Sequence, residues 1–537
     1  MRLHSVALGT GLLGAAAVSA AKNGLPIDKV YGVNLGSWLL VEPWMLPKEW
    51  VEKMGGELCD ADCSSCAASE FDLVKKIGQE KADQVFEEHW KTWFTEKDVD
   101  MIVDAGLNSV RIPLGYWMWN PWLTARPNTT RDEVPQKGTR MVQKEGYPRL
   151  ARPSRLAGCR FRPTMFAGRC TSDVQFYTEK NYRRALIWAG VMTAMTHIDP
   201  DFGSVFGIEA INEPTQDATK TPGYGDYQKR FVEVVRMVEF ALGIKCPDTD
   251  YTKLFFGSSY TDSLDLGFLK VATHTKDSVV IEVLQEVAAS VKSICKDLKI
   301  NISLNLHRSL DLPRAITSSD AVHNKEGHGA GRGTVGSYGP VQVKRAEPVE
   351  HLDTRVPHGS GLERHNARRR LHHERGISAT LSKDVCRTCL MTTFQNRDWQ
   401  YNNPPNPADA ANGPQLYDAH LYFSFGGVAD PNAESYMQVI CNTDRVKNAV
   451  AVGNSPLVFG EWSLATNFNA SREFLHDWAD AQRIIYAGQA DGWFFWSFKI
   501  EEGSLISRTE GYFTNDPSKL TNPDVCKPWI ANSTTSA

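Results

Sequence analysis

The sequence predicts a (β/α)8 barrel, in which eight parallel strands form a ring covered by helices. Short apolar runs alternate with longer segments of helical periodicity over much of the 537 residues, an order typical of a parallel sheet. Two of the apolar runs, 206–213 and 456–461, stop at a glutamate. Functional residues of such barrels lie at the carboxyl ends of the strands, so the fold and these two acids support one another.

The individual elements follow from local patterns. Short apolar runs bounded by polar or glycine residues are expected to be strands, and segments with apolar residues three and four apart are expected to be helices. Tyr227–Leu242 is the clearest helix, because its large apolar side chains share one face. The other expected helices are Glu96–Ala105, Asn181–His197 and Ser471–Ala487. The expected strands are Tyr31–Leu35, Ser109–Pro113, the run ending at Glu213, Leu416–Phe423, the run ending at Glu461 and Gly492–Lys499.

The third and fifth strands are harder to place. The segment Pro127–Pro163 is rich in Arg and Lys and has no convincing periodicity. Leu390–Phe394 is the favoured fifth strand, with Ser278–Leu284 as the alternative. We therefore expect a barrel that is imperfect at these two strands, and a missing strand would expose two unpaired sheet edges.

The chain is expected to comprise a signal peptide, residues 1–20, and a single domain, residues 21–530. Arg2, the apolar stretch that follows it and the small residues before Ala21 are typical of a secretory signal. We expect a secreted protein, extracellular or in the cell wall, whose mature chain begins near Ala21.

Two segments interrupt the domain, 127–163 and 305–384. Both are basic and lack a period of 2 or 3.6 residues, which predicts little regular structure and poor packing. One interpretation is a genuine loop, solvated or binding a polyanion. The other is an error in the gene model, because the composition changes abruptly at both edges.

Composition excludes some classes of function. The net charge of −4 is nearly balanced, so nothing indicates nucleic-acid binding. No segment after the leader reaches the ~18–20 apolar residues of a membrane helix, so no membrane span is expected. Eleven cysteines fit disulfides in an exported protein, although Cys386 and Cys389 have the CxxC spacing of a zinc site. Four sequons predict glycosylation: Asn128, Asn301, Asn469 and Asn532.

Glu213 and Glu461 at neighbouring strand ends would suit the cleavage of a glycosidic bond. That reaction uses two carboxyl groups, one as acid/base and one as nucleophile or base. Two carboxyls held close together favour one protonated and one ionised form, which is the division of labour required. Each could instead be an ordinary ion-paired acid, but acids are rarely buried without a partner.

Six segments in this order resemble the fungal exo-β-1,3-glucanases of glycoside hydrolase family 5. They are Tyr31–Trp44, Gly106–Trp117, Asn212–Pro214, Asp418–Tyr422, Gly460–Trp462 and Gly492–Trp496. The resemblance implies that Glu213 is the acid/base and Glu461 the nucleophile of a retaining mechanism. It also implies that Arg111 bonds the nucleophile and that Asn212 bonds the sugar 2-hydroxyl.

The same resemblance assigns further residues to substrate binding. His420 and Tyr422, which share one face of their strand, would line the subsite of the attacked sugar. Glu42 would bind hydroxyls of the terminal glucose, Trp496 would form the floor beneath it, and Phe425 would form half of an aromatic clamp. The chain departs from the family at the third strand, where the expected Asp-Leu-His-Gly motif and its sugar-binding His are absent.

These observations predict a secreted, monomeric retaining glycosidase that releases glucose from the non-reducing end of β-1,3-glucan. Neither metal nor organic cofactor is expected, because side chains supply both catalytic groups. Alternatives are a related hydrolase acting on β-1,6-glucan, cellulose or mannan, and a catalytically impaired glucan-binding relic.

Overall fold

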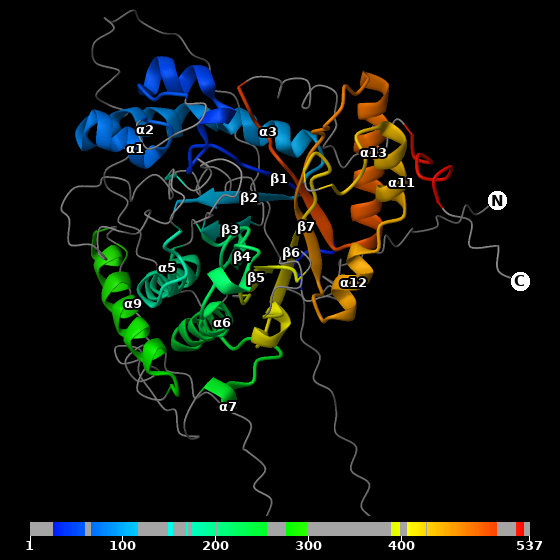
Figure 1. Cartoon of the computed structure of the whole chain (residues 1–537). Helices are drawn as coiled ribbons and strands as arrows, with labels where there is room; N and C mark the ends of the chain where they lie inside the picture. Colours follow the sequence, from blue (N-terminus) through cyan, green and yellow to red (C-terminus); the bar gives the residue numbers. More distant parts are fainter. Residues whose placement is uncertain are drawn as a thin grey trace, which may run out of the picture.

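Eight parallel strands are hydrogen-bonded in closed order, from β1 round to β8, in a (β/α)8 barrel-like fold (Figure 1). The strands are β1 Val30–Asn34, β2 Ser109–Leu114, β3 Arg149–Pro153, β4 Val205–Glu209, β5 Met391–Gln395, β6 Gln415–His420, β7 Leu457–Trp462 and β8 Gly492–Phe495. This computed structural model describes residues 25–58, 66–115, 149–153, 168–169, 174–199, 202–254, 275–297, 300, 388–397, 405–425, 427–501 and 522–530.

Helices connect the strands and cover the outside of the ring. They are α1 Glu70–Ile77, α2 Gln79–Trp93, α3 Glu96–Asp104, α5 Glu179–Ile198, α6 Tyr224–Ala241, α7 Tyr251–Leu254, α9 Ser278–Asp297, α11 Ala433–Cys441, α12 Arg445–Ala451 and α13 Arg472–Gln489. Short turns of other helix types are Pro43–Met45, Glu49–Met54, Ala218–Lys220 and Pro407–Ala410. In Figure 1, α5, α6 and α9 lie on one side of the sheet, and α11 and α13 lie on the other.

The structure confirms the favoured fifth strand, and the alternative at Ser278–Leu284 is wrong. That segment begins α9, where the side chains of Val280, Val283, Leu284 and Val287 are fully buried. Their spacing of three and four residues is the period of a helix. An apolar segment of only seven residues fits either a strand or a helix, and the longer pattern decides between them.

The expectation that 127–163 holds no strand is wrong at Arg149–Pro153, although the register of this strand with β4 shifts between Arg149 and Leu150. Arg149–Pro153 pairs in parallel with β2 on one side and with β4 on the other. Both neighbours would otherwise present unpaired backbone groups, and an extended segment satisfies them through its own backbone. The sequence does not reveal this strand, because backbone pairing with β2 and β4 does not require an apolar pattern of side chains. The other residues of 127–163, all of 305–384 and the leader 1–20 lie outside the described residues.

An apolar cluster fills the amino-terminal end of the barrel. Its buried members are Leu25, Val30, Phe206, Met391, Leu416, Val458 and Phe494. Six of them lie within the first three residues of their strands. This apolar plug leaves the carboxyl-terminal half of the barrel interior to the charged side chains.

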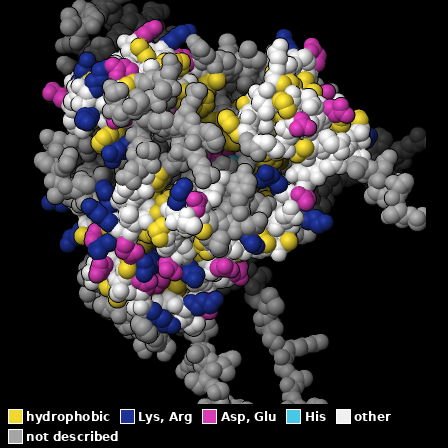
Figure 2. Space-filling view, viewed as in Figure 1, with side chains coloured by type: hydrophobic (Ala, Val, Ile, Leu, Met, Phe, Trp, Pro, Cys, Tyr) yellow, Lys and Arg dark blue, Asp and Glu magenta, His cyan; other side chains and the backbone are white. Residues whose placement is uncertain are grey.

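The charged side chains on the face shown in Figure 2 are of both signs and interleaved. On the helices around α9, Arg183 pairs with Glu282 and Glu286, and Arg230 pairs with Asp277. Such a surface does not form a basic patch on this face of the described residues. Among the described residues, we also find no helix with the length and apolar character needed to cross a membrane.

Disulfides join distant parts of the chain. Cys246 is bonded to Cys389, which lies just before β5, and Cys441 of α11 is bonded to Cys526. Cys66 is also disulfide-bonded, and Cys295 is a buried free thiol. Because Cys389 is committed to Cys246, it is not available as a zinc ligand, and its CxxC partner Cys386 lies outside the described residues.

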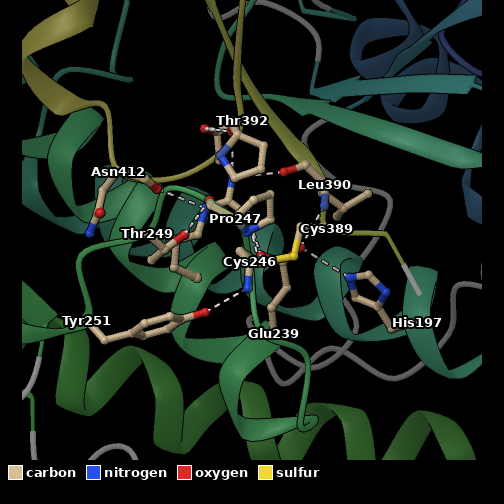
Figure 3. Close-up of a disulfide and its surroundings, with 12 residues drawn as sticks. His197, Glu239, Cys246, Pro247, Thr249, Tyr251, Cys389, Leu390, Thr392 and Asn412 are labelled. Carbon is tan, nitrogen blue, oxygen red and sulfur yellow. Dashed lines mark hydrogen bonds and ion pairs between the residues drawn. A yellow bond between two sulfur atoms is a disulfide. The ribbon is translucent and has the colours of Figure 1, made fainter. Parts of the chain in front are cut away.

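Glu239 lies beside the first of these disulfides, with His197 and Leu390 nearby (Figure 3). Glu239 pairs with Arg236 on α6, lies 3.3 Å from the His197 ring and accepts a 2.7 Å hydrogen bond from the Leu390 backbone nitrogen. Arg236 in turn donates to the carbonyl oxygens of Leu390, Asn412 and Pro414. Burial alone would raise the pKa of Glu239, but Arg236 and His197 lower it below its ordinary value. The cluster therefore fixes the start of β5 against α6.

We predict that Glu239→Gln lowers the free energy of unfolding by about 3 kcal/mol near neutral pH, because it leaves Arg236 buried without its carboxylate. The loss should shrink in acid. A carboxylate whose folded pKa is lowered stabilises the protein above its ordinary value of 4.5 and stops doing so as pH falls through the lower folded value. Chemical denaturation at several pH values measures both effects.

Glu282→Gln is the matched control, since Glu282 pairs with Arg183 on the surface and its side chain is 55% exposed. This substitution should lower the free energy of unfolding by less than about 1 kcal/mol. Equal losses in the two variants would contradict the structural importance of the buried pair.

Candidate active site

Six of the predicted site residues converge at the carboxyl ends of the strands. Arg111 lies in β2, His420 ends β6 and Glu461 lies in β7. Asn212 and Glu213 follow β4, and Tyr422 follows β6. Five of the six side chains are nearly fully buried, and Tyr422 is half-buried.

The two predicted catalytic carboxyls face one another. One oxygen of Glu213, one oxygen of Glu461 and a ring nitrogen of His420 all lie within 4.8 Å of one another. Retaining glycosidases hold their two carboxyls ~5–5.5 Å apart, whereas inverting enzymes leave ~6.5–9.5 Å for a water molecule. The geometry therefore matches the retaining arrangement.

Arg111 is the centre of the hydrogen-bond network. Its Nη1 donates to Glu461 Oε1 at 2.7 Å and to Asn34 Oδ1 at 3.0 Å. Its Nη2 lies 2.9 Å from Glu209 Oε2 and 2.8 Å from Asp418 Oδ2. It also donates to Asn212 Oδ1 at 3.1 Å. One guanidinium thus contacts side chains from β1, β4, β6 and β7 and holds Glu461 in place.

The charges of this network stabilise one another. Burial alone would lower the pKa of Arg111, but the carboxylates of Glu209, Asp418 and Glu461 raise it above its ordinary value. Burial alone would raise the pKa of Asp418, but Arg111 and His420 lower it. The network therefore favours a charged Arg111 and an ionised Asp418.

The neighbours of His420 determine its tautomer. The donors Arg111 Nη2 and Gln395 Nε2 lie 3.0 and 3.1 Å from His420 Nε2, closer than the acceptor Asp418 Oδ2 at 3.3 Å, which favours this nitrogen as an acceptor. The proton of the neutral ring is then on Nδ1, which donates to Glu213 Oε1 at 2.7 Å. Glu461 Oε2 lies 3.4 Å from the same Nδ1 and accepts a 2.7 Å hydrogen bond from the Tyr422 hydroxyl. His420 thus lies between the two carboxyls and orients Glu213.

The backbone at Glu213 is strained. β4 ends at Glu209, four residues before Glu213, so the expectation that the strand continues to Glu213 is wrong. Glu213 has a φ of 45°, a left-handed conformation that is uncommon for residues other than glycine. Tyrosine hydroxyls support this loop from both sides: Tyr227 donates to the carbonyl of Ala210, and Tyr177 accepts from the backbone nitrogen of Thr215.

The remaining predicted residues lie at the same end of the barrel. Glu42 follows β1, is buried and accepts a 3.1 Å hydrogen bond from the Trp44 indole. Trp496 follows β8, and its backbone nitrogen donates to the carbonyl of Trp462 at 2.7 Å, beside Glu461. Phe425 is 70% exposed and lies edge-on to the Tyr422 ring, with 6.3 Å between the centroids.

Sequence analysis missed four residues of the network: Asn34, Glu209, Gln395 and Asp418. Asp418 could have been found, because it stands two residues before His420 and so shares its face of β6. Asn34 ends β1 and lies one residue before the end of the predicted first strand. Glu209 gave no comparable signal, because the strand was expected to continue past it.

The donors of the site could also hold a divalent metal ion. Glu213, His420 and Glu461 each place one ligand atom within 4.8 Å of the others. The second such group in the described residues is Glu239 with Cys246 and Cys389, but its two sulfurs are joined in a disulfide.

No protein-family model matches the chain. Among curated relatives, it is 32% identical over 247 residues to glucan endo-1,6-beta-glucosidase B of Emericella nidulans, covering 44% of this chain and 57% of that protein. It is 41% identical over 106 residues to glucan 1,3-beta-glucosidase of Schwanniomyces occidentalis, covering 19% of this chain and 24% of that protein. The chain thus matches less than two thirds of the length of these relatives, and both are β-glucan glycosidases by name.

Two solved structures are similar in outline. The crystal structure of rutinosidase from Aspergillus niger has 15% identity and a TM-score of 0.47, covering 90% of this chain and 98% of that chain. A GH5-4 broad specificity endoglucanase from an uncultured bovine rumen ciliate has 10% identity and a TM-score of 0.38, covering 87% and 86%.

Proposed function

We propose that this protein is a retaining glycosidase of β-glucans, with Glu213 as acid/base and Glu461 as nucleophile. The observation that carries the proposal is the separation of the two carboxyls, with oxygens within 4.8 Å of one another at the carboxyl end of the barrel. The similarity to β-glucan glycosidases supports the substrate class.

In the first step, Glu461 attacks the anomeric carbon of the bound sugar. Arg111 and Tyr422 each donate a 2.7 Å hydrogen bond to one oxygen of Glu461, which keeps it ionised and aimed. Glu213 donates its proton to the glycosidic oxygen as the bond to the anomeric carbon breaks. The leaving sugar departs as an alcohol, and the remaining sugar is esterified to Glu461.

In the second step, water hydrolyses this ester. Glu213, now ionised, takes a proton from the water while the new carbon–oxygen bond forms and Glu461 is released. His420 Nδ1–H, 2.7 Å from Glu213 Oε1, holds the carboxyl in position for both proton transfers. Asn212, Glu42 and Trp496 are proposed to bind the sugar hydroxyls and ring at this end of the barrel.

Exo-cleavage of β-1,3-glucan is the first candidate specificity, because it follows from the motifs in the sequence. β-1,6-Glucan is the second candidate, because the longer stretch of similarity is to an endo-1,6-beta-glucosidase. β3 carries Arg149-Leu150-Ala151-Arg152-Pro153 and so provides no His there for the sugar. We therefore expect a slower enzyme than one with that contact.

The test is turnover of purified protein on linear β-1,3-glucan, linear β-1,6-glucan, cellulose and mannan, with products identified by chromatography and by NMR of the anomeric proton. Release of glucose with retained configuration from β-1,3-glucan supports the first candidate. Binding without turnover of any glucan would show a catalytically impaired relic. Activity lost to a chelator and restored by a divalent ion would assign the carboxyl pair to a metal site instead.

We predict that Glu461→Gln lowers kcat at least a thousandfold and leaves glucan affinity within about threefold, because the nucleophile acts on the chemistry rather than on ground-state binding. Stopped assays give kcat, and calorimetry gives the affinity. A variant that keeps more than about a tenth of the wild-type rate would contradict the assignment.

Glu213→Gln should separate the two steps. An aryl β-glucoside with a good leaving group needs no proton, so the ester to Glu461 should still form, while its hydrolysis slows for want of a base. We expect a burst of aryl alcohol followed by slow turnover, together with loss of glucan hydrolysis. Equal losses on both substrates would argue against an acid/base role, and the surface variant Glu282→Gln should behave as wild type.

We also propose that the protein is exported through the leader at residues 1–20, on the basis of Arg2 and the apolar residues after it. Expression in a fungal host should yield secreted protein that begins near Ala21, as read by N-terminal sequencing. Full-length protein retained in the cytosol, with none in the medium, would be the opposite result.

A further inference from the structure

β7 contains one residue more than either of its neighbours. Towards β6, Phe459 pairs with Ala419 and Glu461 pairs with His420, so two residues of β7 match one of β6. Towards β8, Phe459 pairs with Trp493 and Trp462 pairs with Phe495, so an advance of three residues along β7 matches an advance of two along β8. Both registers show a β-bulge between Phe459 and Trp462, and Gly460 is the residue skipped on the β6 side. Bulges change the direction in which the following side chain points.

The bulge decides the direction of Glu461. Val458 points into the barrel and belongs to the apolar plug, and Phe459 points outward, stacked on Tyr486 of α13 with 3.9 Å between centroids. In a regular strand, side chains alternate, so Glu461 would point outward like Phe459 and Trp462 would point inward. Instead Trp462 contacts Tyr486, and Glu461 contacts Arg111 inside the barrel.

Two side chains from other strands hold the Gly460 peptide unit in this position. Asp418 Oδ1 of β6 accepts a 2.7 Å hydrogen bond from the Gly460 nitrogen. Asn34 Nδ2 of β1 donates at 2.8 Å to the Gly460 carbonyl. The approach is so close that a Cβ on Gly460 would lie 2.0 Å from Asp418 Oδ1. The extra residue breaks the strand ladder, and these contacts satisfy the groups it leaves unpaired.

The same two side chains also hold the guanidinium that bonds Glu461. Asp418 Oδ2 lies 2.8 Å from Arg111 Nη2, and Asn34 Oδ1 accepts from Arg111 Nη1 at 3.0 Å. We propose that Asp418 and Asn34 are positioning residues that aim Glu461 into the barrel by holding the bulge at Gly460. This inference rests on the proposed function, since it assigns to these residues the placement of its nucleophile.

The test compares Asp418→Asn with Asp418→Ala. Both variants remove the negative charge, but only Asn keeps an oxygen that can accept from the Gly460 nitrogen. If the bulge contact matters, kcat should fall about 10-fold in Asp418→Asn and about 100-fold or more in Asp418→Ala, with KM within about threefold in both. Asp100→Asn, on the exposed face of α3, is the matched control and should behave as wild type.

A second readout follows Glu461 itself. A 2-fluoro-β-glucosyl mechanism-based inactivator esterifies a correctly aimed nucleophile, and peptide mass spectrometry locates the label. The rate constant for labelling Glu461 should fall in the same order as kcat. Asn34→Ala provides an independent arm should Asp418→Ala fail to fold, because it removes the contact on the other side of the peptide unit. We expect it to label about 10-fold more slowly than wild type, while thermal unfolding shows a folded protein.

The outcomes are distinct. Equal losses in Asp418→Asn and Asp418→Ala would overturn the inference, because the effect would then come from charge alone. Unchanged labelling in Asn34→Ala would overturn it as well. If the wild-type protein neither hydrolyses glucan nor becomes labelled at Glu461, the proposed function itself fails, and the inference falls with it.

Discussion

The ionic contacts of Arg111 are the constraint on which the carboxyl end of this barrel depends. A guanidinium buried without partners would be strongly unfavourable, so each surrounding carboxylate is needed, and each carboxylate is tolerable only because Arg111 is present. The network joins strands that are far apart in the sequence, and an apolar plug lies at the opposite, amino-terminal end of the barrel. The interior thus has two layers: an apolar layer at the amino-terminal end, and a layer of charged side chains at the carboxyl end. Removal of one charge from the polar layer would leave the others uncompensated.

Local sequence patterns predicted much of the fold, and they failed where the structure of a segment depends on the strands or helix around it. The strands at Tyr31–Leu35 and Ser109–Pro113 and the helix at Tyr227–Leu242 each carry their own period, so they could be read from the chain. Arg149–Pro153 has no such pattern, because its place as a strand comes from the unpaired edges of β2 and β4. Ser278–Leu284 failed for a different reason: its apolar residues fit either period until the whole length of α9 is considered.

The candidate site shows the same division. His420 and Tyr422 could be placed on one face because they are two residues apart in an extended segment, although β6 itself ends at His420, and both contact the paired carboxyls. Glu209 could not be identified, because nothing in the apolar run shows that β4 stops there and that Glu213 lies in a strained loop beyond it. The bulge in β7 is invisible in the sequence for a similar reason. An inserted residue is defined only against the two strands that flank it, and neither pairing can be read from one segment alone.

The disulfide between Cys246 and Cys389 has a topological consequence. It closes a covalent ring across 143 positions of sequence, and closing a ring of that size restricts the unfolded chain by about 5 kcal/mol in the chain-entropy description. The two ends of this ring are held beside each other whatever lies between them. The link between α6 and β5 therefore does not depend on the length of the chain between them, although α9 within that stretch buries its own apolar side chains. If one peptide bond between Cys246 and Cys389 were cleaved, the disulfide would still join the two fragments covalently.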